Sequence, residues 1–67
     1  MKPPLTPRQL QCVRLLCMGM IQKQIAGELG VSLKTIRYHL QSAYARTGTS
    51  GQVTLALWAV RNGVVKL

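Results

Sequence analysis

The feature that most constrains the fold is a glycine corner in the middle of the chain, at Gly30. Before it, Ile25, Ala26 and Leu29 are spaced as on one face of a helix, and glycine most readily adopts the left-handed conformation that ends a helix. After it, Ser32 is a good N-cap, because its hydroxyl accepts a hydrogen bond from a free first-turn amide. The stretch therefore predicts two short helices joined by a tight turn.

The helix that follows the corner has two different faces. At 100° per residue, Ile36, Leu40 and Ala43 fall on one side, which is suited to packing. The opposite side is cationic and polar and carries Lys34, Arg37, Tyr38 and Gln41. A turn followed by a helix of this kind is typical of a helix-turn-helix, whose second helix enters the major groove of DNA.

The charge balance points to an anionic partner. Nine lysines and arginines face one acid, Glu28, for a net charge of +8 on 67 residues, and such a chain attracts polyanions. A membrane surface is also anionic, but the longest nearly apolar run, residues 53–60, is too short to span a bilayer. The N-terminus lacks the order of a signal peptide. We therefore expect a cytoplasmic protein with a nucleic-acid partner and no membrane.

The few reactive side chains favour neither an enzyme nor a metal site. Cys12 and Cys17 point about 140° apart on one predicted helix, and no further Cys/His pair completes a zinc site. Glu28 and His39 offer no credible acid and base pair. We expect buried, unreactive cysteines, no cofactor, no metal and no small-molecule ligand.

The patterns predict an all-α domain of four helices. They span residues 7–18, 22–29, 33–46 and 51–62. The first begins with a capping box, in which Thr6 caps the helix and Gln9 reaches back, and the last begins after Ser50 as N-cap. Residues 1–4 are predicted to be a flexible arm, and residues 5–67 the domain.

The fourth helix is apolar nearly all round, so it must be covered on two sides. One predicted face packs on the domain and consists of Val53, Ala56, Leu57 and Val60. We expect a second copy of the chain to cover the other side. That side would place Leu55, Trp58, Ala59 and Asn62 at a homodimer interface. The alternative is that Trp58 folds onto its own domain and Leu55 stays exposed.

An ordered set of motifs extends the argument to the whole chain. The motifs are residues 5–8, 14–16 with Gly19, 23–26, 29–32, 35–37 with His39, and Gly48 with Ser50. In this order the chain resembles the LuxR/FixJ/GerE-type DNA-binding domain of bacterial transcription regulators from Leu5 to Val65. The resemblance implies four helices, with the fourth at a dimer interface. Since no sensor domain precedes the motifs, we expect a stand-alone regulator from a bacterium or a phage.

The resemblance also implies roles for single residues. It places Arg37, Tyr38 and Gln41 against base edges, in agreement with the exposed stripe. Arginine pairs with guanine O6 and N7, glutamine pairs with adenine, and the tyrosine is suited to a thymine methyl or a phosphate. Phosphate contacts, which position the protein without specifying sequence, are expected from Lys23, Ser32, Lys34, Thr35, His39 and Arg46.

The leading hypothesis is a sequence-specific transcription regulator. It would bind a roughly palindromic operator in double-stranded DNA as a homodimer, with the third helix in the major groove. The alternative is a small interaction protein that binds and inhibits another transcription regulator through its fourth helix.

Overall fold

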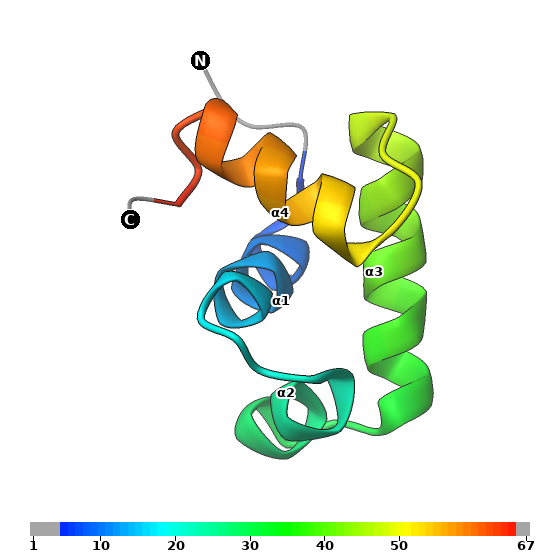
Figure 1. Cartoon of the computed structure of the whole chain (residues 1–67). Helices are drawn as coiled ribbons and strands as arrows, with labels where there is room; N and C mark the ends of the chain where they lie inside the picture. Colours follow the sequence, from blue (N-terminus) through cyan, green and yellow to red (C-terminus); the bar gives the residue numbers. More distant parts are fainter. Residues whose placement is uncertain (1–4, 66–67) are drawn as a thin grey trace.

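The computed structural model describes residues 5–65, which fold into four helices without strands. The helices are α1 (Pro7–Cys17), α2 (Gln22–Leu29), α3 (Leu33–Thr47) and α4 (Gln52–Arg61). α1 lies between α2 and α4, and α3 runs alongside all three (Figure 1). The predicted all-α class is confirmed. The predicted arm, residues 1–4, lies outside the described residues.

Two glutamine side chains define where the first two helices begin. The Thr6 hydroxyl accepts a hydrogen bond from the Gln9 amide at 3.2 Å, and Gln9 Oε1 accepts from the Thr6 amide at 3.0 Å. This is the predicted capping box. At α2 the N-cap, Ile21, has no side-chain acceptor, and Gln24 Oε1 instead accepts from the Ile21 amide at 3.0 Å. Each glutamine thus satisfies an amide that the helix leaves without a partner.

All four helices contribute to one apolar core. Its fully buried large side chains are Val13 and Cys12 from α1, Ile25 from α2, Ile36 and Leu40 from α3, and Leu55 from α4. Ala43 of α3 and Ala59 of α4 are also fully buried. The packing side predicted for α3 therefore faces the core.

The orientation of α4 overturns part of the predicted dimer interface. Leu55 and Ala59 are 0% exposed in the core, and Trp58 is half-buried and packs against it. Val53 and Leu57, in contrast, are 75% and 53% exposed. The assignment of Leu55 and Ala59 to a surface that a second copy covers is wrong, because neither has exposed area. Both sides of α4 are apolar, and its packing against α1 and α3 decides which one is buried.

The start of α4 also differs from the prediction. The N-cap is Gly51 rather than Ser50. The Thr54 hydroxyl accepts hydrogen bonds from the Ser50 amide at 3.1 Å and from the Gly51 amide at 3.0 Å. These bonds hold the two amides that precede the helix, whereas a serine N-cap would have accepted from amides inside the first turn. None of the helices in residues 5–65 is long and apolar enough to cross a bilayer.

Candidate nucleic-acid interface

The corner between α2 and α3 has the geometry that its sequence predicts. Gly30 is left-handed, with φ 67° and ψ 33°, and the Val31 amide donates to the Ala26 carbonyl at 3.0 Å. A Cβ atom at Gly30 would meet nothing within 4 Å, so glycine is required there for its backbone conformation and not for space. The corner thereby sets the direction in which α3 leaves α2.

The first turn of α3 is held by two hydroxyl groups. Ser32 Oγ accepts from the Thr35 amide at 3.1 Å and lies 2.9 Å from Thr35 Oγ1, which confirms Ser32 as the N-cap. Ser32 and Lys34 are exposed, and Thr35 is half-buried. Three of the predicted phosphate-contacting residues therefore gather at a helix N-terminus, the end of a helix that attracts anions.

The outer side of α3 forms a continuous polar surface, here named the reading face. It consists of Lys34, Arg37, Tyr38 and Gln41, all exposed. At about 1.5 Å per residue, Lys34 and Gln41 lie roughly 10 Å apart along the axis, or about three base-pair steps. Since the opposite side of α3 is buried, the reading face is the side of this helix that can enter a groove.

Tyr38 is the large apolar side chain of the reading face. The residue is 67% exposed. The neighbouring His39 is half-buried, with its ring centroid 5.9 Å from that of Tyr38 at an interplanar angle of 61°. The histidine thus lies at the border between the packed side and the exposed tyrosine.

Two predicted phosphate contacts lie on other turns of the helices. Lys23 is exposed near the start of α2. Arg46 is in the last turn of α3, roughly 18 Å along the axis from Lys34. The structure therefore brings Ser32, Lys34 and Thr35 together at the start of α3, places Arg46 at the other end of that helix, and leaves Lys23 exposed on α2.

The sequence patterns did not predict a second, apolar surface of the domain. Two adjoining hollows, of about 310 and 280 Å³, lie between the end of α1 and α4 and share Val53 and Ala56. We name this region the apolar strip and define it by Cys17, Ile21, Val53, Ala56, Leu57 and Val60. No charged side chain lines either hollow. The signal in the sequence is the grouping of Val53, Leu57 and Val60 on one side of the helix, and the prediction that this side packs on the domain is wrong because all three are exposed.

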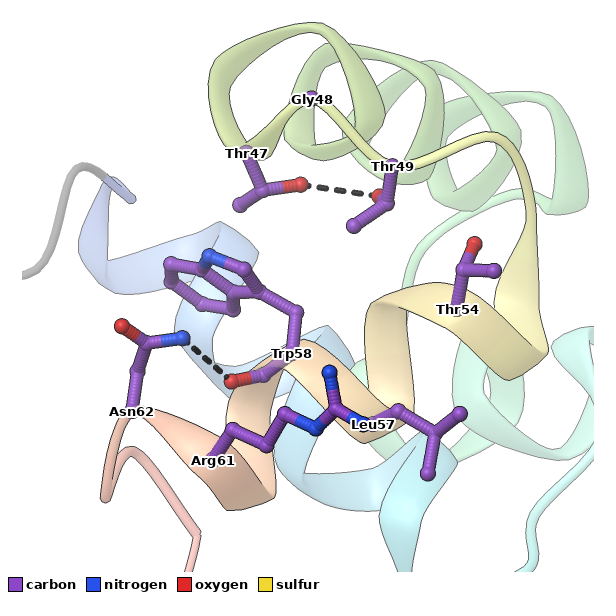
Figure 2. A pocket seen from close by; sticks show the side chains of 8 residues that line it. All are labelled: Thr47, Gly48, Thr49, Thr54, Leu57, Trp58, Arg61 and Asn62. Carbon is purple, nitrogen blue, oxygen red and sulfur yellow. Dashed lines mark hydrogen bonds between the residues drawn. The ribbon is translucent and has the colours of Figure 1, made fainter.

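A third hollow, of about 360 Å³, lies between the end of α3 and α4 (Figure 2). The Thr47 and Thr49 hydroxyls are 2.9 Å apart, and Asn62 Nδ2 donates to the Trp58 carbonyl at 2.8 Å. The first bond lies at the end of α3 and the second at the end of α4, so each holds its own segment of the lining. Asn62, predicted at a dimer interface, is exposed at its rim.

The two cysteines are part of the packing of α1. Cys12 is fully buried and Cys17 is half-buried. Burial raises the pKa of both thiols from 9.0, which disfavours the reactive thiolate. Within residues 5–65 no three His, Cys, Asp or Glu side chains gather in a way that could hold a metal ion.

The glycine corner and the reading face together define a helix-turn-helix DNA-binding domain. Comparison with known proteins agrees with this class. The family described as bacterial regulatory proteins, luxR family, matches residues 3–59. The chain belongs to the luxR family of bacterial regulatory proteins, as the motifs predicted, and is a DNA-binding domain of transcription regulation.

Similar proteins differ in how much of their length this chain covers. The spore germination protein GerE of Bacillus subtilis (strain 168) is 35% identical over 66 residues, which cover 98% of this chain and 89% of GerE. The transcriptional regulatory protein UhpA of Escherichia coli (strain K12) is 43% identical over 53 residues, 79% of this chain but 27% of UhpA. The chain therefore spans about a quarter of that relative.

A solved structure confirms the fold. The structure of the transcription factor GerE superposes with a TM-score of 0.89 at 29% sequence identity, and the match covers 97% of each chain.

Proposed function

We propose that this chain regulates transcription by binding a short, roughly palindromic operator as a homodimer, with α3 of each copy in a major groove. The proposal places it in the cytoplasm, on the bacterial nucleoid. The observation that carries it is the reading face, an exposed cationic surface on a helix whose other side is fully buried. A side chain with no packing role can be varied to match a DNA sequence without loss of the fold.

Each residue of the proposed interface has a chemical role. Arg37 presents a planar fork suited to guanine O6 and N7, and Gln41 presents an amide suited to adenine N6 and N7. Tyr38 completes the base contacts. The phosphate contacts are assigned to Lys23, Ser32, Lys34, Thr35, His39 and Arg46, which would fix the register of α3 in the groove.

The homodimer is supported by the apolar strip. Val53, Leu57 and Val60 expose apolar area on one side of α4, and contiguous exposed apolar area marks interaction sites. Two copies that each carry a positive charge can meet there because no charged side chain lines the hollows, so like charges stay away from the centre of the contact. A two-fold contact through this strip would match a two-fold operator.

The reading function is tested by selecting bound duplexes from a random DNA pool and measuring their affinity against salt concentration. Phosphate contacts weaken steeply as salt rises, whereas base contacts distinguish one sequence from another. We expect the selected duplex to remain bound at salt concentrations at which random DNA dissociates. Equal affinity for all sequences at every salt concentration would contradict the proposal.

The homodimer is tested by Leu57→Glu, with Gln11→Glu as the control. Both positions are exposed, so both variants gain the same charge on the surface, but only Leu57 belongs to the strip. Sedimentation equilibrium should show a dimer for the wild type and the control, and a monomer for Leu57→Glu. A wild type that remains a monomer even on its selected duplex would rule out the homodimer.

A second candidate is a small protein that binds and inhibits another transcription regulator through α4. It is favoured by the length of the apolar strip, which extends past α4 to Ile21 at the start of α2. In this case the wild type is a monomer alone and forms a one-to-one complex with a second luxR-family regulator. Leu57→Glu would then abolish that complex and leave DNA binding unchanged.

A further inference from the structure

We infer that Tyr38 makes this domain sensitive to the C5-methyl group of a pyrimidine, so that one thymine in each half-site is recognised by its methyl. The inference rests on the proposed function, in which α3 lies in the major groove. It adds a specificity that depends on a single chemical group of the DNA.

The first support is the position of an apolar ring on a cationic surface. Tyr38 is 67% exposed, on the side of α3 opposite the fully buried Ile36 and Leu40. Its ring therefore adds little to the core and keeps its area free for a ligand. On the base edges of the major groove, the thymine methyl is the apolar feature, whereas the other groups are hydrogen-bond donors and acceptors. The methyl group is the natural partner of an apolar ring.

The second support is the angular order of the reading face. At 100° per residue, Arg37 and Tyr38 lie at its two margins, with Gln41 and Lys34 between them. The two margins differ by about 1.5 Å along the helix axis, which is less than one base-pair step of about 3.4 Å. The thymine that Tyr38 contacts should therefore lie at the base pair contacted by Arg37 or at an adjacent one.

The third support is the brace that His39 gives to the ring. The two ring centroids are 5.9 Å apart at an interplanar angle of 61°, an edge-to-face arrangement. Such pairs are attractive, and a ring that is held before binding loses less conformational entropy on contact. His39 is a positioning residue in this account and touches no base.

The experiment uses the duplex selected from the random pool. Each thymine is replaced in turn by deoxyuridine, which removes the methyl and keeps the base pairing, and affinity is measured for the wild type, Tyr38→Phe and Tyr38→Ala. We expect one substitution per half-site to weaken wild-type binding about fourfold, which corresponds to roughly 0.8 kcal/mol for a buried carbon group. Tyr38→Phe should keep this sensitivity, and Tyr38→Ala should lose it.

A second arm adds the methyl back. The sensitive thymine pair is replaced by cytosine paired with guanine, and in a parallel duplex by 5-methylcytosine paired with guanine. The methylated duplex should bind the wild type more tightly than the unmethylated one, and Tyr38→Ala should bind the two equally. Melting curves of all three proteins confirm that each variant is folded, as expected for an exposed position.

Three results would overturn the inference. In the first, no thymine is sensitive to loss of its methyl. In the second, deoxyuridine weakens the wild type and Tyr38→Ala by the same factor, so another residue contacts the methyl. In the third, Tyr38→Phe loses the sensitivity to the methyl as completely as Tyr38→Ala does, which assigns the effect to the hydroxyl and not to the apolar ring. If the wild type prefers no DNA sequence in the selection itself, that result overturns the proposed function together with this inference.

Discussion

Helices α3 and α4 solve the same packing problem and leave very different surfaces. Each buries one side in the shared core, through Ile36 and Leu40 in α3 and through Leu55 and Ala59 in α4. The outer side of α3 is polar and cationic, whereas the outer side of α4 exposes Val53 and other apolar groups. The core explains only the inner sides. The outer sides therefore suit two different kinds of contact, and we propose DNA as the partner of α3 and an apolar protein surface as the partner of α4.

The largest expected effect separates the two sides of α4. Leu55→Ala removes a fully buried side chain and should lower the free energy of unfolding by about 2–5 kcal/mol, a large part of the stability of a domain this small. Leu57→Ala removes an exposed side chain and should change the unfolding of the monomer by less than about 0.5 kcal/mol. Urea denaturation of dilute protein measures both. Equal losses would mean that the two sides of α4 do not differ as described.

The next effect tests the outer side of α3. Arg37→Ala should cost about 1–3 kcal/mol of discrimination at one base pair while the fold stays intact. The control is Arg14→Ala, an exposed arginine on α1, which should lower affinity equally for all sequences or leave it unchanged. Competition binding with single-base variants of the selected duplex measures the preference. A uniform loss in Arg37→Ala would reduce its role to a phosphate contact.

The role of the corner in directing α3 is tested by two glycine substitutions, one at the C-cap of α2 and one inside α2. Gly30→Ala forces a side chain into the left-handed conformation and should destabilise the fold by about 1–2 kcal/mol. Gly27→Ala, at an exposed position inside α2, should stabilise it by about 0.5–1 kcal/mol, because a Cβ atom there meets nothing within 4 Å. Thermal unfolding gives both values. Two shifts of the same sign would contradict the role assigned to the corner.

The smallest effect concerns the core that α3 and α4 share. Burial raises the pKa of the Cys12 thiol above 9.0, so the unfolded thiol loses its proton at a lower pH than the folded one. The resulting stability is present below pH 9 and is lost as the pH rises above it. Urea denaturation between pH 7 and pH 10 should show this fall, and Cys12→Ala should make it shallower. If the free energy of unfolding falls with pH equally steeply in Cys12→Ala, the fall comes from other groups.

Local sequence signals predicted the parts of the structure that depend on neighbouring residues. The capping box of Thr6 and Gln9, the left-handed Gly30 and the N-cap Ser32 each involve atoms a few residues apart. The buried side of α3 could be predicted in the same way, because the opposite side of the helix is polar and cationic and does not suit a core. The bounds of α2 agree with the prediction to the residue.

The orientation of α4 could not be predicted from its own sequence. Leu55 with Ala59, and Val53 with Leu57, are two apolar sides of equal plausibility at helical spacing. Which of them is buried depends on how α4 meets α1 and α3, which is a property of the whole domain. The predicted N-cap of α4 was also wrong, since the cap is Gly51 and Thr54 holds the amides that precede the helix. Base contacts stay predictions, because they depend on the DNA as much as on the protein.

The exposed cations of the reading face also influence the folding of the free protein. With Glu28 as the sole acid against nine basic residues, the folded chain carries self-repulsion that added salt screens. Salt should therefore raise the melting temperature of the free domain while it weakens the DNA complex. A bound duplex would supply the same screening at low ionic strength, so DNA should stabilise this small fold as a counterion does.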